Sequence, residues 1–293
     1  MPKGKKKNFQ YEHLKKVWTK RHKELEKEIF EKHKDSIDWL SQNSKQFAVG
    51  SLAGLFLLTS PIIPKIPTAF SSASAEINKI IDKKIFLVYD LKNILPSEVR
   101  PLTEEEGVNV GEVLTRTYGF RVTPELEGKR LNTSYGLIGQ EQHLKRYPGD
   151  NMLNHFDNQE DAEKYFKYGI APGLGAWRYF ANSQGEMTQK DIDREKYYIA
   201  VQTFLAPGFN ENVREYVNFF KYRKMLVVNP QNGKAMVVVV GDAGPAKWTG
   251  KSLGGSPEVM TYLERYDGRQ RGPVLYFFID DPDDKIPLGP VSM

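Results

Sequence analysis

Short apolar runs dominate the second half of the chain. They are rich in β-branched and aromatic residues, and turn signals such as Asn229-Pro230 and Asn232-Gly233 separate them. The runs are YYIAVQTFL (197–205), RKMLVVN (223–229), KAMVVVVGD (234–242) and PVLYFFID (273–280). Runs of this length predict β-strands, and the Asn-Gly step between the second and third predicts a hairpin. The pattern therefore predicts a small β-barrel or sandwich after about residue 170.

The first half has a different pattern. KIFLVYDL at 84–91 contains five consecutive apolar residues (IFLVY, 85–89) and predicts the first strand of this part of the chain. LTEEEGVNVGEVLTRTYG at 102–119 predicts a helix with acidic residues in its first turn, and NQEDAEKYFKYG at 158–169 predicts a short helix that ends at a glycine. A further helix start is expected at Ser256-Pro257-Glu258.

The N-terminal region carries two long patterned segments. Residues 8–40 have apolar positions at helical spacing between Lys and Glu, which predicts a basic amphipathic helix. Such a helix pairs with a copy of itself, lies on a membrane surface, or stays solvated. Residues 47–63 (FAVGSLAGLFLLTSPII) have no charge, which is typical of a short membrane span or a signal segment; the alternative is a buried helix of a soluble protein.

These patterns predict an α+β protein with five segments. They are a basic cytoplasmic segment (1–46), a transmembrane or signal segment (47–64), a linker (65–83), an unassigned α/β extension (84–168) and a barrel domain (169–293).

Charge and composition narrow the function classes. The net charge is +5, but residues 1–46 alone have a surplus of six positive charges, so the remainder is close to neutral and does not favour a nucleic-acid partner. The chain has no cysteine, which excludes disulfides and thiolate metal sites. Because the basic stretch precedes residues 47–63, the positive-inside rule predicts a cytoplasmic N-terminus and an extracytoplasmic C-terminal part, anchored or secreted.

The C-terminal runs resemble a known family. GLGAWRYFANSQGE (173–186), YYIAVQ (197–202), RKMLVVNPQNGKAMVVVVGDAGPA (223–246) and GGSPEVMTYLE (254–264) resemble, in order, the landmarks of the rare lipoprotein A double-psi β-barrel domain. Lytic transglycosylases and expansins are related to it more distantly. The match covers about residues 170–280, and its most specific part is the hairpin followed by Gly-Asp-Ala-Gly-Pro.

The resemblance implies a six-stranded double-psi barrel that binds peptidoglycan glycan strands. It also implies that Asp242, assisted by Glu186, acts as general acid and base in glycan cleavage without water. The residues expected to bind substrate are Trp177, Tyr179, Gln202, Gly244, Lys247 and Trp248. Gln202 stands where the family has His, and a Gln side chain cannot titrate, so a non-catalytic, expansin-like glycan-binding module is the alternative function.

Several of these residues have simpler interpretations. Asp242 can be a turn residue that bonds its own backbone. Glu186 can be an ordinary surface residue, and Trp177 can belong to the core. His143 and His155 lie outside the matched region, where a lone loop histidine is usually a surface residue. The sequence therefore predicts no metal site and no cofactor.

Overall fold

The computed structural model describes residues 83–265 and 272–291. The segments expected at 1–46, 47–64 and 65–83, including the amphipathic pattern at 8–40 and the apolar run at 47–63, lie outside the described residues, except for Lys83. Within the described ranges, no helix combines the length and the apolar character that crossing a membrane requires.

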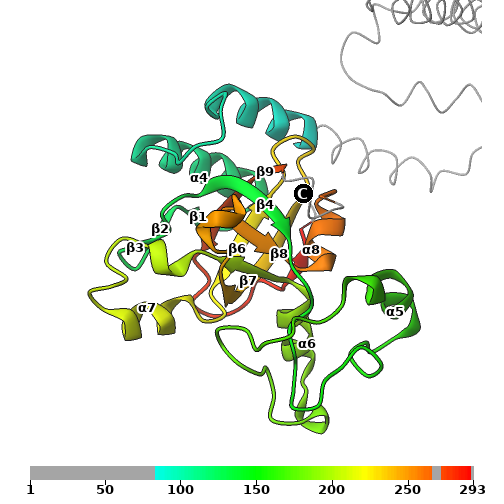
Figure 1. Ribbon diagram of the computed structural model, residues 1–293. Helices are drawn as coiled ribbons and strands as arrows, with labels where there is room; N and C mark the ends of the chain where they lie inside the picture. The colour runs from blue at the N-terminus through cyan, green and yellow to red at the C-terminus, as the bar shows by residue number, and fades with distance from the viewer. Residues whose placement is uncertain (1–82, 266–271, 292–293) are drawn as a thin grey trace, which may run out of the picture. The chain divides into compact units, whose positions relative to one another are not determined.

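Six strands close into a mixed β-barrel, so the fold belongs to the α+β class (Figure 1). The strands are β4 (Tyr135–Gln140), β5 (Tyr198–Val201), β6 (Lys224–Val228), β7 (Ala235–Ala243), β8 (Leu253–Gly255) and β9 (Gly272–Ile279). The β4–β8 and β5–β7 pairs are parallel. The β4–β9, β5–β8, β6–β7 and β6–β9 pairs are antiparallel, and together these six pairings complete the ring.

Shorter elements surround the barrel. Two short strands, β1 (Val122–Thr123) and β10 (Gly289–Pro290), extend the sheet on β9 and β7, and β2 (Glu125–Leu126) pairs only with β3 (Lys129–Arg130). The α-helices are the segment 83–94, α4 (Glu104–Tyr118), α5 (Gln159–Tyr165), α6 (Gln189–Lys196), α7 (Val213–Phe220) and α8 (Pro257–Tyr262). The 3-10 turns are η2 (Phe166–Tyr168), η3 (Gln184–Glu186), η4 (Thr203–Leu205) and η5 (Lys247–Thr249).

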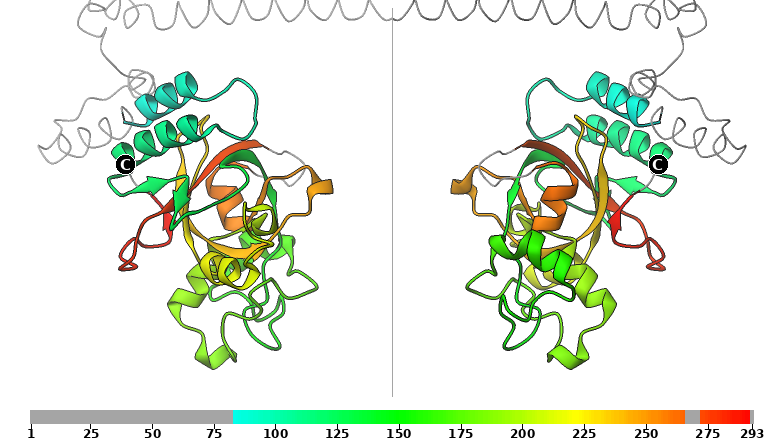
Figure 2. Two further views of the ribbon diagram at one scale, coloured as in Figure 1. Left: turned by 90° about the vertical axis from the view of Figure 1, so that its left-hand side faces the viewer. Right: turned by 90° about the vertical axis from the view of Figure 1, so that its right-hand side faces the viewer.

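The valine run of β7 is buried because both faces of that strand are covered. Val238 and Val240 belong to a core cluster that takes side chains from all six barrel strands, so this cluster fills the barrel interior. Val237 belongs to a second cluster, which contains Leu91 and Leu114 from two helices. Figure 2 shows these helices, 83–94 and α4, next to each other against the outside of the barrel.

The strand expected at 84–91 is wrong, because residues 83–94 form a helix. Leu87 and Leu91, one helical turn apart, are buried against the barrel, whereas Ile85 and Tyr89 are exposed. A strand would have placed all four side chains on one face. The continuous apolar run concealed the helical spacing of the two residues that are buried.

Other expectations are confirmed. Helix α4 begins at a capping box formed by Thr103 and Glu106 and ends at Gly119, which adopts a left-handed conformation. The β6–β7 hairpin forms, and Ser256 caps α8.

The boundary at residue 169 does not separate the barrel from the extension, because β4 comes from the earlier segment and lies between β8 and β9.

Candidate functional site

Asp242 lies at the end of β7, directly after an irregularity in the strand. Ile199 of β5 pairs with Val240 of β7, but the next residue of β5, Ala200, pairs with Asp242. Gly241 is therefore the extra residue of a β-bulge. A Cβ atom on Gly241 would lie 2.5 Å from the Cβ of Tyr198, which leaves no room for a side chain. The bulge therefore depends on glycine, and it sets the direction in which the next residue points.

The carboxylate of Asp242 is held through one of its two oxygens. Oδ1 accepts hydrogen bonds from the backbone N–H groups of Ala176, at 2.6 Å, and Ala243, at 2.8 Å. Oδ2 accepts no hydrogen bond from the residues that the structure describes. Burial raises the pKa of Asp242, although the two backbone donors act in the opposite direction. The group therefore combines a fixed position with an oxygen that remains available for a proton.

Trp177 and Gln202 have structural roles in the barrel. The Trp177 side chain is only 8% exposed, belongs to the barrel core, and donates its indole N–H to the carbonyl of Val240. Gln202 is buried, and its amide nitrogen donates to the carbonyls of Pro245, at 3.0 Å, and Lys251, at 3.3 Å. Trp177 is therefore a core residue, which was the alternative interpretation of its role. Gln202 holds the two ends of the loop that follows β7 through these hydrogen bonds.

That loop carries the exposed residues of the predicted site. Gly244 donates its N–H to the carbonyl of Val201, which ties the start of the loop to β5. Lys247 and Trp248 lie in the 3-10 turn η5 and are exposed, and 89% of Trp248 is accessible to solvent. An indole this exposed contributes little to the core and is free to contact a ligand.

Glu186 and Tyr179 line a separate hollow of about 520 Å³. Glu186 is exposed and accepts hydrogen bonds from the side chains of Asn182 and Ser183. Trp177 also lines this hollow, but Asp242 does not. The structure therefore does not bring Glu186 and Asp242 together around one cavity.

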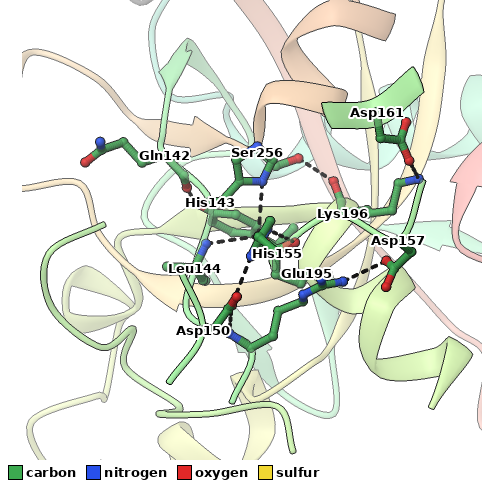
Figure 3. Close-up of polar contacts among 12 residues, drawn as sticks. Gln142, His143, Leu144, Asp150, His155, Asp157, Asp161, Glu195, Lys196 and Ser256 are labelled. Atoms are coloured by element: carbon green, nitrogen blue, oxygen red, sulfur yellow. Dashed lines mark hydrogen bonds and ion pairs between the residues drawn. The ribbon is translucent and has the colours of Figure 1, made fainter. Parts of the chain in front are cut away.

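A second polar centre was not expected from the sequence. His143, His155 and Glu195 are at most 2% exposed, and one ligand-type atom of each lies within 4.8 Å of the others (Figure 3). His155 Nε2 is 3.2 Å from Glu195 Oε2, and His143 Nδ1 is 3.4 Å from Glu195 Oε1. Asp150 completes the group, with its Oδ2 2.9 Å from His155 Nδ1.

Three segments hold this cluster in place: the β4–α5 connection, residues 169–171 and helix α6. His143 and His155 lie in the connection between β4 and α5, and Glu195 lies in the last turn of α6. The backbone of His143 exchanges hydrogen bonds with Gly169 and Ala171, and the N–H of Leu144 donates to Glu195 Oε1. Helix α6 keeps Glu195 buried although its sequence, QKDIDREK, is typical of a solvated helix.

Charge interactions inside the cluster are strong. Burial alone would lower the pKa of His155, but its contacts with Asp150 and Glu195 raise it to about 9. Burial would raise the pKa of Glu195, but the two histidines lower it. Burial raises the pKa of Glu258 to about 7, and this carboxyl is close enough to His143 and Glu195 for both to act on it.

Comparisons of the chain with protein-family models, with curated proteins and with solved structures return no match.

Proposed function

We propose that this protein binds peptidoglycan glycan strands at the end of the barrel where β7 ends, and that Asp242 acts there as general acid and base in a lytic transglycosylase-like cleavage. The observation that carries the proposal is the Asp242 carboxylate, with Oδ1 fixed by two backbone N–H groups and Oδ2 without a hydrogen bond from the described residues. A carboxyl whose pKa is raised by burial holds a proton at higher pH than a solvated one.

The chemistry needs one titratable group that acts twice. Protonated Asp242 donates its proton to the glycosidic oxygen as the bond between that oxygen and the anomeric carbon breaks. The resulting carboxylate then takes the proton of the same sugar's 6-hydroxyl, whose oxygen bonds to the anomeric carbon. The products are a free hydroxyl on one fragment and a 1,6-anhydro ring on the other, and no water is consumed.

The exposed loop after β7 supplies the binding surface. The indole of Trp248 offers a flat apolar face for a sugar ring, and Lys247 offers a positive charge for a carboxylate of the peptide stem. Gln202 supports this surface indirectly, because it holds the carbonyls at the two ends of the loop.

Support for the double-psi topology and for the envelope location comes from the sequence. The resemblance at 170–280 places its Asp-x-Gly-Pro motif at Asp242, Gly244 and Pro245, and this stretch follows the long hairpin strand of a closed six-stranded barrel. The apolar run at 47–63 supports anchoring or secretion, and the pattern at 8–40 supports self-association or contact with a membrane surface.

Two observations favour the non-catalytic alternative. Glu186 lines a hollow that Asp242 does not reach, and Gln202 cannot titrate, so Asp242 would act without a second acid or base from the predicted set. An expansin-like module that binds glycan without cleaving it requires only the exposed loop. The two functions differ in their products.

Incubation of the full-length chain with purified sacculi tests both functions. Cleavage predicts soluble anhydromuropeptides that D242N abolishes, while D283N, which changes an exposed aspartate elsewhere, leaves them unchanged. Binding alone predicts that the chain sediments with sacculi, that W248A weakens this, and that no soluble product appears. A chain that neither sediments nor releases product contradicts both functions.

A further inference from the structure

The cluster of His143, His155 and Glu195 has the chemistry of a metal centre. We propose that these three side chains bind one divalent transition-metal ion, for which zinc is the best match. Two imidazoles and one carboxylate are ligands that zinc commonly takes in proteins. The sequence predicted no metal site, and this inference is independent of the proposed glycan function.

The separations within the cluster suit a shared ion. Two ligand atoms bound tetrahedrally to one zinc ion are roughly 3.3–3.6 Å apart, given bonds of about 2.0–2.2 Å. Glu195 Oε2 lies 3.2 Å from His155 Nε2, and Glu195 Oε1 lies 3.4 Å from His143 Nδ1. One ligand atom from each of the three side chains lies within 4.8 Å of the other two, so the widest-spaced pair would move closer together when an ion binds. In Figure 3 the labelled side chains of His143, His155 and Glu195 meet at the centre of the cluster.

Asp150 has the position of a supporting residue. Metal-bound histidines commonly donate the N–H that faces away from the metal to a carboxylate, which fixes the ring and its tautomer. Asp150 Oδ2 lies 2.9 Å from Nδ1 of His155, and the backbone N–H of Arg146 donates to the same oxygen at 2.7 Å. This contact leaves Nε2, on the opposite side of the ring, for the ion.

His143 supplies an independent indication that a ligand is bound. Its side chain is fully buried, and neither ring nitrogen has a hydrogen-bond partner among the described residues. A buried polar atom without a partner is costly, and a bond to a metal ion removes that cost for one of the nitrogens. His143 therefore faces the position at which His155 and Glu195 converge.

The charges of the buried groups also fit a divalent cation. Asp150 and Glu195 bring two carboxylates into a region that excludes water, and the nearby guanidinium of Arg146 pairs with Asp157 instead. A third buried carboxyl, that of Glu258, lies close to His143 and Glu195. A divalent ion balances the charges of Asp150 and Glu195 when the two histidines are neutral.

The site is closed to substrates, so the ion would have a structural role. Its ligands come from the β4–α5 connection and from α6, which are more than 30 residues apart in the sequence. A bound ion would fasten the connection to the helix. The same connection also contacts the segment whose Ala176 N–H donates to Asp242, because the carbonyl of Arg146 accepts the N–H groups of Phe180 and Ala181.

Zinc titration of the full-length, untagged chain tests the proposal. After the metal is stripped with a chelator, we expect the chain to take up one zinc ion, measured by competition with a chromophoric chelator. E195Q and H143A should weaken zinc binding at least about ten-fold, and D150N, which keeps all three ligands, should weaken it by about 10–100-fold. E211Q, which changes an exposed glutamate outside the cluster, should not weaken it.

Folding and metal loss are separated by two further measurements. Far-UV circular dichroism establishes that each variant is folded, and E195Q and D150N preserve the shape of the side chains they change. Cobalt added in place of zinc should give the visible absorption of tetrahedral Co²⁺ in the wild type and lose it in E195Q. Zinc uptake that is absent from the stripped wild type, or that is unchanged in folded E195Q and D150N, would overturn the proposal and leave the cluster as an ion-pair network.

Discussion

Replacing Gln202 with Met separates a structural role for this residue from a role in ligand binding. Methionine has nearly the same length and shape as glutamine but donates no hydrogen bond. The substitution removes the two bonds from Gln202 to the carbonyls of Pro245 and Lys251. Because Gln202 is only 6% exposed, water cannot simply take the place of the lost donor.

The expected loss of stability follows from these two bonds. A hydrogen bond contributes about 1 kcal/mol net, and a buried acceptor left without its donor costs about 1–3 kcal/mol. Pro245 is buried and Lys251 is half-buried, so the free energy of unfolding should fall by about 2–4 kcal/mol. For a domain of about 150–250 residues, this corresponds to a fall in Tm of roughly 4–16 °C.

Urea denaturation of the full-length chain, followed by circular dichroism, measures this change. The control is Q189M, which removes a hydrogen bond from an exposed glutamine on α6 to Asp193 and should leave the midpoint nearly unchanged. If Q202M unfolds at the wild-type midpoint while binding to sacculi is lost, the assignment of Gln202 to the scaffold is refuted. The residue would then contact the ligand directly.

Two further predictions concern the helix 83–94 and Asp242. L91A should lower the free energy of unfolding by about 2–5 kcal/mol because Leu91 is fully buried. The control Y89A, on the exposed face of the same helix, should change it by no more than about 0.5 kcal/mol. Equal losses for the two variants in urea denaturation would contradict the helix. Because burial raises the pKa of Asp242, the folded wild type takes up a proton more readily than the unfolded chain, and the stability that this provides is lost as the pH rises through the raised pKa. Relative to D242N, the wild type should therefore lose stability as the pH rises from the ordinary pKa of Asp, about 3.9, through the raised pKa of Asp242. Parallel urea midpoints for the two proteins from acid to neutral pH would show that the carboxyl is not perturbed.

Four of the six barrel strands, β5, β6, β7 and β9, could be predicted from the sequence, whereas β4 and β8 could not. The runs at 225–228 and 235–240 are apolar throughout because the core lies inside the barrel and helices cover its outside, and the Asn-Gly step marks their hairpin. The run at 85–89 is equally apolar but forms a helix. Only its contacts with the barrel reveal that Leu87 and Leu91 are the residues that pack.

The two polar centres differ in how much the sequence could reveal. Asp242 directly follows a buried strand and a glycine, and this local pattern was enough to single it out. His143, His155 and Glu195 have no such local pattern, because two lie in a long connection and one in a highly charged helix. Their proximity depends on the path of the β4–α5 connection past α6, which no spacing along the chain discloses.

The position of β9 in the barrel has a consequence for synthesis of the protein. Strand β9 pairs with β4 and with β6, so the ring of strands stays open until residues 272–279 are present. These residues lie near the C-terminal end of the sequence, and a ribosome makes them after all of the other five barrel strands. A nascent chain therefore exposes the strand edges of β4 and β6 until β9 has been made, and this is the period in which aggregation is the greatest risk.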